Sequence, residues 1–133
     1  MNVMERMRLA MHVEKSDVLL RTDFRQAGSA SQVSRCLRVL CLEGSLMRIG
    51  TGIYAKTRVS SVTGQLIPRG SLETLSKQVL ERLGIEVRPG RATAQYNQGM
   101  TTQLPGRLVV NTGQRRISRI IEVGGRRLMY ERG

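Results

Sequence analysis

Residues 29–56 read SASQVSRCLRVLCLEGSLMRIGTGIYAK, and the elements encoded in this stretch decide the fold that the sequence predicts. Its first half has helical periodicity, with an apolar face made of Val33, Leu37, Leu40 and Cys41. The opposite face is polar and carries Ser31, Arg35 and Arg38. Ser29 or Ser31 is placed to cap the N-terminus of this helix, and Gly44 to end it.

A hairpin is expected directly after this helix. The segments SLMRIG and GIYAKTR are strand-like and meet at Gly50–Thr51–Gly52, a short turn suited to a hairpin. Upstream, residues 1–12 (MNVMERMRLAMH) have the pattern of a first helix. Residues 17–22 (DVLLRT) predict a short strand, and residues 23–27 (DFRQA) predict a short helix that Thr22 caps. The order helix, short strand, short helix, tight turn, helix, hairpin is that of a winged helix-turn-helix.

The second half of the chain predicts a separate small α/β module. Residues 59–70 (VSSVTGQLIPRG) show no hydrophobic periodicity and are rich in turn-forming residues. A linker is therefore expected between domains at 1–60 and 66–133. LETLSKQVLERL then predicts a helix capped by Ser71, followed by short strands and a short helix. A Gly124–Gly125 turn predicts a C-terminal hairpin with Glu122 opposite Arg127. The expected fold class is therefore α+β, a winged helix-turn-helix followed by a small α/β module ending in a β-hairpin.

Composition points to an anionic partner. The chain has 133 residues, with 22 Lys and Arg against 10 Asp and Glu, for a net charge of +12. Basic proteins of this size commonly bind polyanions, because phosphate contacts release condensed counterions. The low aromatic content, 3%, argues against the stacking platforms of single-strand binders.

Catalytic and metal-binding patterns are not expected. His12 is the single histidine, and Cys36 and Cys41 are spaced to lie on different sides of one helix. No phosphate-loop motif is present, so the sequence predicts a protein that is not an enzyme and binds no metal or cofactor. A metal-free ribonuclease using Tyr96, Asn97 and arginines is the enzymatic alternative. The N-terminus lacks a signal peptide pattern and no stretch reaches transmembrane length, which predicts a cytoplasmic protein without membrane contact.

Candidate DNA-binding residues follow from the predicted helix and wing. Four residues near the start of the helix are expected to contact base edges: Ser31, Gln32, Ser34 and Arg35. Four cations are expected to contact phosphates: Arg38, Arg48, Lys56 and Arg58. The structural alternative is that these are solvated polar positions on a packed helix.

Two features of the second half add to these candidates. A secondary basic surface is expected from Arg115, Arg116, Arg126 and Arg127. The polar stretch Gln95–Gln103 is either a helix terminus whose amides satisfy backbone groups or a contact surface for a partner.

The residues from Asp17 to Lys56 resemble the N-terminal winged-helix domain of the AbiEi-type antitoxins of type IV toxin–antitoxin systems. The resemblance rests on TDFRQAGSASQVSRCLRVL and on EGSLMRIGTGIYAKTR, where glycines flank the wing turn before Tyr54. AQYNQGMTTQLPGRLVVN looks like the tail of short standalone relatives of that family. The resemblance implies binding to operator DNA, repression of the protein's own operon, and opposition to a nucleotidyltransferase-like toxin.

The sequence therefore predicts a sequence-specific double-stranded DNA-binding transcriptional regulator, with a cognate toxin as a further expected partner. The alternative is a protein-binding inhibitor or adaptor from a mobile element, which would use the winged fold to grip a protein or ribonucleoprotein partner.

Overall fold

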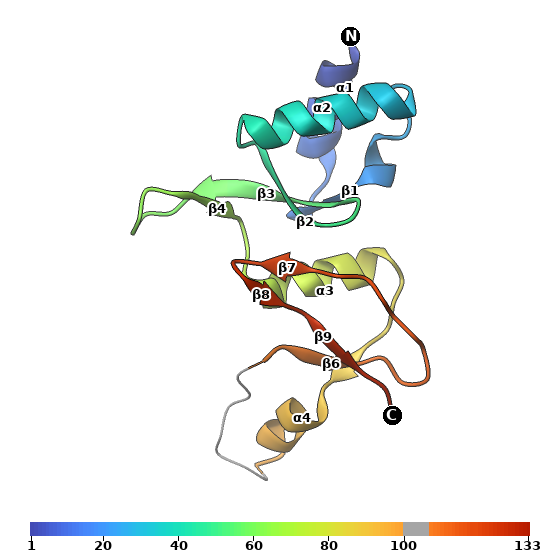
Figure 1. Ribbon diagram of the computed structural model, residues 1–133, viewed down its shortest axis with the longest axis vertical. Helices are drawn as coiled ribbons and strands as arrows, with labels where there is room; N and C mark the ends of the chain where they lie inside the picture. Colours follow the sequence, from blue (N-terminus) through green and yellow to red (C-terminus); the bar gives the residue numbers. More distant parts are fainter. Residues whose placement is uncertain (100–106) are drawn as a thin grey trace. The chain divides into compact units, whose positions relative to one another are not determined.

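The chain forms helices and short strands in the computed structural model, which describes residues 1–99 and 107–133 (Figure 1). The fold is mixed α+β, as the sequence predicted. The chain divides into two compact units, Met1–Ser71 and Leu72–Gly133, which are described separately below. No helix in the described ranges combines the length and the apolar character needed to cross a membrane.

The first unit begins with a helix, a short strand and a single 3-10 turn. These are α1 (Val3–Val13), β1 (Val18–Leu20) and η1 (Arg21–Phe24). The predicted first helix is confirmed, and the Oδ1 of Asn2 caps it by accepting the N–H of Glu5 at 2.8 Å. The predicted cap at Thr22 is wrong. The short helix starts directly after β1, and the carboxylate of Asp23 accepts the N–H of Leu20 at 2.8 Å instead.

The next helix, α2 (Ala30–Leu42), has well-defined signals at both ends. Ser29 is its N-cap, and its hydroxyl accepts the N–H of Gln32 while the Gln32 side chain accepts the N–H of Ser29. At the other end Gly44 adopts a φ of 87°, which L-residues rarely adopt. The Ser45 N–H reaches the Leu40 carbonyl at 2.9 Å, which completes a Schellman motif. The predicted helix and its glycine stop are confirmed.

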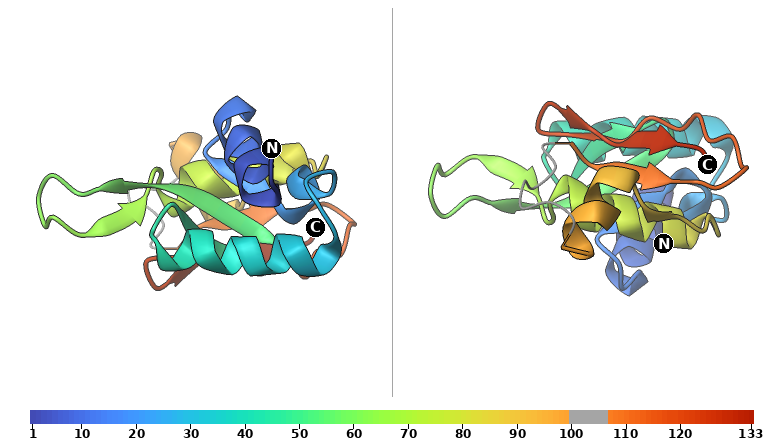
Figure 2. Two further views of the ribbon diagram at one scale, coloured as in Figure 1. Left: turned by 90° about the horizontal axis from the view of Figure 1, so that it is seen from above. Right: turned by 90° about the horizontal axis from the view of Figure 1, so that it is seen from below.

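Three strands follow α2: β2 (Leu46–Gly50), β3 (Ile53–Val59) and β4 (Leu66–Pro68). Together with β1 they form an antiparallel sheet of order β1-β3-β2, in which β4 also pairs with β3. The predicted turn between β2 and β3 is confirmed, with Gly50 opposite Ile53. The predicted linker over residues 59–70 is wrong, because Leu66–Pro68 pairs with β3 and forms a hairpin that projects from the sheet (Figure 2).

The core of this unit lies between the helices and one face of the sheet. Met7 from α1, Leu19 from β1 and Phe24 from η1 are each fully buried. Val33, Leu37 and Leu40 of α2 and Leu46 of β2 complete the buried cluster. Each such side chain stabilises the fold by about 1.5–3 kcal/mol relative to exposure. This packing fixes which face of α2 remains outside.

The second unit contains two helices and short strands. The helices are α3 (Leu72–Arg82) and α4 (Arg91–Asn97). The strands are β5 (Arg88–Pro89), β6 (Val109–Asn111), β7 (Glu122–Val123), β8 (Arg126–Arg127) and β9 (Met129–Glu131). The predicted pairing of Glu122 with Arg127 is confirmed.

The expectation that this module ends in the hairpin is wrong. After β8 the chain continues into β9, which pairs in parallel with β6 in a sheet of order β5-β6-β9. Parallel partners cannot be joined by a tight turn, so this pairing leaves no local turn signal in the sequence. Leu72, Leu75 and Val79 of α3 are buried, and so are Ile121 and Leu128 at the base of the hairpin.

Candidate nucleic-acid interface

The outward face of α2 is polar and basic. Ser31, Arg35 and Arg38 are exposed on it, because Val33, Leu37 and Leu40 turn the opposite face into the core. Within the described residues, neither the Arg35 nor the Arg38 guanidinium makes a hydrogen bond or an ion pair. Both are therefore placed to bind an external acceptor, and a planar guanidinium suits phosphate or a base edge.

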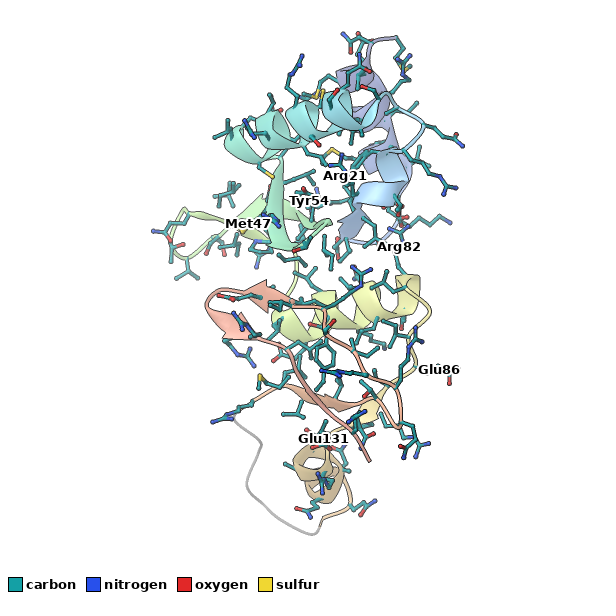
Figure 3. All side chains as sticks on the ribbon, turned by 45° about the vertical axis from the view of Figure 1, so that its right-hand side comes forward. Arg21, Met47, Tyr54, Arg82, Glu86 and Glu131 are labelled. Atoms are coloured by element: carbon teal, nitrogen blue, oxygen red, sulfur yellow. The ribbon has the colours of Figure 1, made fainter. Side chains whose placement is uncertain are left out.

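Arg21 ties this face to the neighbouring elements. Its guanidinium donates to the Ala30 carbonyl at 2.9 Å and to the Ser34 hydroxyl at 2.8 Å. Its backbone N–H donates to the Gly52 carbonyl in the β2–β3 turn at 2.9 Å. Figure 3 labels Arg21 beside α2. Sequence reasoning missed this residue, for which the only signal is its position directly after a buried strand.

The β2–β3 turn carries a further cation. The Nε of Arg48 donates to the Gly50 carbonyl at 3.2 Å, and its terminal nitrogen lies 3.4 Å from the Thr51 hydroxyl. These contacts fold the exposed Arg48 side chain along its own turn. Because Arg21 bonds both Gly52 and α2, the turn lies next to the N-terminal half of the helix. Basic groups from the two elements thus occur in one region of the unit.

Two of the predicted contact residues have internal partners that the sequence did not indicate. The side-chain oxygen of Gln32 accepts the Ser29 N–H at 2.9 Å, so it belongs to the helix cap. The half-buried Lys56 ammonium donates to the Glu14 carbonyl at 2.5 Å, near the C-terminus of α1. These bonds give both side chains a role in the fold. Ser34 is exposed and accepts from Arg21, while Arg58 is exposed on β3 where this strand pairs with β4.

Apolar side chains share the outward face of α2. Leu42 is 81% exposed and Val39 is 43% exposed. They lie toward the C-terminal end of the helix, beyond Arg35 and Arg38. The N-terminal half of this face therefore offers hydroxyls and guanidinium groups, and the C-terminal half offers an apolar surface.

The thiols and His12 form no reactive cluster with one another. Cys36 and Cys41 are free thiols, each partly buried against the core. Burial raises the pKa of the Cys41 thiol above 9.0, although the backbone N–H and the charge of Arg48 act in the opposite direction. His12 is exposed on α1. Among residues 1–99 and 107–133, no three His, Cys, Asp or Glu side chains come together as a metal site.

A broad groove of about 1300 Å³ lies in the second unit. Leu80 and Ile85 give it an apolar wall, and Lys77, Glu81 and Arg115 supply charged groups. The hydroxyl of Ser76, on the same helix as Leu80, is buried and has no hydrogen-bond partner among the described residues. Charges of both signs line this groove, so it has no single electrostatic preference.

The residues of the predicted secondary basic surface differ in their contacts. Arg126 forms an ion pair with Glu73 at 2.7 Å, and Arg127 forms one with Glu122 at 3.2 Å. Arg115 and Arg116 are exposed, and their side chains bond no described residue. The predicted group therefore consists of two arginines in ion pairs and two arginines whose side chains bond nothing in the described part of the chain.

The polar stretch Gln95–Gln103 spans the end of α4. Gln95, Asn97 and Gln98 are exposed, and the Gln98 N–H donates to the Ala94 carbonyl at 3.0 Å. The remainder of the stretch, from residue 100 onward, lies outside the described residues.

Comparison with known proteins places the chain in a family. Neither the curated proteins nor the solved structures contain a significant match. A family model described as "Family of unknown function (DUF6088)" matches residues 5–133, almost the whole sequence. The chain therefore belongs to the DUF6088 family.

Proposed function

We propose that the first unit is a winged helix-turn-helix that binds double-stranded DNA in a sequence-specific manner, with α2 as the recognition helix. The order α1, β1, η1, α2, β2, β3 and the strand order β1-β3-β2 support this proposal. The major groove of B-DNA is wide enough to admit an α-helix, where short polar and basic side chains contact base edges.

The observation that carries the proposal is a pair of guanidinium groups on the exposed face of α2 that bond none of the residues the structure describes. Arg35 and Arg38 lie on the side opposite the core, within the region that Arg21 joins to the β2–β3 turn. In this arrangement Ser31 and Arg35 contact bases, Arg38 and Arg48 contact phosphates, and Arg21 holds the helix and the turn in register. Binding of this kind suits a cytoplasmic transcriptional repressor that acts without catalysis or a cofactor.

The resemblance to AbiEi-type antitoxins makes repression of an adjacent toxin–antitoxin operon the expected biological role. That role needs a DNA-binding unit and a toxin-facing surface. The exposed Val39 and Leu42 favour a second candidate function, in which α2 docks on a protein.

Selection from a random duplex pool with the full chain tests the proposal. Arg35→Gln should lower affinity for the selected duplex about 5- to 150-fold, equivalent to about 1–3 kcal/mol, and should affect a random duplex less. Lys15→Gln is the charge-matched control, because this exposed lysine lies outside α2 and the β2–β3 turn. Failure to enrich any sequence, or an equal loss for both variants, would overturn the proposal.

The protein-docking candidate makes a different prediction. The product of a neighbouring gene should then co-purify with the chain, and Leu42→Ser should abolish this association. Under the DNA-binding proposal, Leu42→Ser should leave affinity for the selected duplex nearly unchanged.

A further inference from the structure

The second unit carries far more positive than negative charge. Between Leu72 and Gly133 there are eleven Lys and Arg residues and five Glu residues, a difference of +6. Three of the five carboxylates already bind arginines within the unit: Glu73 binds Arg126, Glu122 binds Arg127, and Glu131 binds Arg91. These pairs remove most of the acidic groups that could neutralise the remaining arginines.

Four arginines near the C-terminus bond no described residue through their side chains: Arg115, Arg116, Arg119 and Arg132. All four are exposed, and none of their guanidinium groups bonds a side chain or carbonyl of residues 1–99 or 107–133. Residues 100–106 contain no Asp or Glu, so the sequence supplies no carboxylate there for an ion pair. We call these four residues the arginine quartet.

Backbone contacts bring three members of the quartet together. Thr112 is only 6% exposed, and its hydroxyl donates to the Arg115 carbonyl at 2.7 Å. The Thr112 N–H donates to the Glu131 carbonyl at 2.9 Å, and the Gly133 N–H donates to the Gly113 carbonyl at 3.1 Å. Arg132 therefore lies directly beside the turn that leads into Arg115 and Arg116.

Arg119 joins the same region through Tyr130. The Tyr130 hydroxyl donates to the Arg119 carbonyl at 2.7 Å. Tyr130 lies in β9, which ends directly before Arg132. Burial raises the pKa of the Tyr130 phenol, while the Arg119 charge acts in the opposite direction, which agrees with their proximity. The loop after β6 and the C-terminal strand run close together in Figure 1.

We propose that the arginine quartet is a second, sequence-independent binding surface for the phosphate backbone of nucleic acid. Four exposed guanidinium groups that bond no described residue give this region a local excess of positive charge. An extended polyanion binds such a region favourably, because each phosphate contact releases condensed counterions. Guanidinium forks also bind phosphate oxygens in a bidentate manner. Serine, glycine and glutamine around the quartet allow close approach of a backbone.

The chain offers a control pair matched in charge for testing this surface. Arg115→Gln with Arg116→Gln removes two unpaired cations. Arg126→Gln with Arg127→Gln removes two cations of the same type that already bind Glu73 and Glu122. Both double variants of the full chain have the same net charge. Circular dichroism and urea unfolding establish that each one is folded.

Affinity for a random-sequence DNA duplex is then measured between about 50 and 200 mM salt. The slope of log K against log salt should fall by about 1.8 for the Arg115→Gln/Arg116→Gln variant, since each lost phosphate contact contributes about 0.9. The slope should change much less for the Arg126→Gln/Arg127→Gln control. Arg119→Gln with Arg132→Gln should produce a similar decrease.

Equal changes for the two matched variants would mean that net charge alone acts, and the proposal would be wrong. An unchanged slope in the quartet variants would also overturn it. Equally tight binding to polyglutamate, lost in the same variants, would assign the surface to an acidic protein instead. Because a random duplex is the probe, these outcomes do not depend on whether α2 recognises a specific sequence.

Discussion

The guanidinium of Arg21 donates a hydrogen bond of 2.8 Å to the hydroxyl of Ser34. The bond spans 13 residues and connects η1 to the exposed flank of α2. Arg21 also bonds the Ala30 carbonyl and, through its backbone, the Gly52 carbonyl. Arg21 thus connects the helix directly to the β2–β3 turn.

This relationship predicts an energetic coupling between Arg21 and Ser34. In a double-mutant cycle of Arg21→Ala and Ser34→Ala, the free energies of unfolding should differ from additivity by about 0.5–1 kcal/mol, because each change removes the same bond. Urea unfolding of the four proteins measures this coupling. Arg25→Ala with Ser34→Ala should be additive, since the Arg25 side chain bonds no described residue. Additivity in both cycles would show that the bond contributes nothing in solution.

The cap of α2 predicts different costs for two nearby serines. Ser29→Ala should lower the free energy of unfolding by about 1 kcal/mol, because the hydroxyl accepts the Gln32 N–H at the helix N-terminus. Ser31→Ala should change it by less than about 0.5 kcal/mol, because Ser31 is exposed within the first turn. Thermal or urea unfolding distinguishes them. A larger loss at Ser31 would place the cap there instead.

Lys56 and Arg48 should affect different properties. Lys56→Gln should reduce the free energy of unfolding by about 1 kcal/mol, because the ammonium bonds the Glu14 carbonyl inside the fold. It should leave the salt dependence of DNA binding nearly unchanged. Arg48→Gln should lower the salt slope by about 0.9 with little loss of stability, since its own bonds are long and exposed.

DNA titrations at several salt concentrations and urea unfolding of both variants test these expectations. A reduced salt slope for Lys56→Gln with an unchanged free energy of unfolding would show that Lys56 contacts phosphate, as the sequence predicted.

The Cys41 thiol should respond to pH in a defined direction. Burial raises its pKa above 9.0, so the folded chain holds the proton more tightly than the unfolded chain. The free energy of unfolding should therefore fall as pH rises through 9.0 toward the pKa of the folded state. Iodoacetamide alkylation of a Cys36→Ser variant, followed across pH, should have its midpoint above that of the urea-unfolded chain. A midpoint at or below the unfolded value would contradict this account.

Local patterns allowed much of the first unit to be predicted. Three signals act over only a few residues and can therefore be recognised in the sequence. They are the periodicity of α2, its end signals at Ser29 and Gly44, and the glycines around Thr51. The pairing of Glu122 with Arg127 was predictable for the same reason, because a two-residue Gly-Gly turn sets the register of its hairpin. The exposure of Arg35 and Arg38 followed from the same helical period.

The contacts of individual cations were not predictable in this way. Lys56 lies 42 residues from its acceptor Glu14, and Arg126 lies 53 residues from Glu73. Arg126 and Arg116 look alike in the sequence, yet only Arg126 meets a carboxylate. Residues 66–68 likewise have the composition of a linker and become a strand only because β3 offers an open edge.

The sequence by itself determined the helix faces, the ends of α2 and the tight turns, because periodicity, capping and left-handed glycines depend on neighbouring residues. Only the tertiary structure decided the parallel pairing of β6 with β9, the strand at Leu66–Pro68, and which arginines remain without a carboxylate. Each of these features joins segments that lie far apart in the sequence. Whether their backbone groups or charges meet depends on how the chain folds, which the type of a single residue does not indicate.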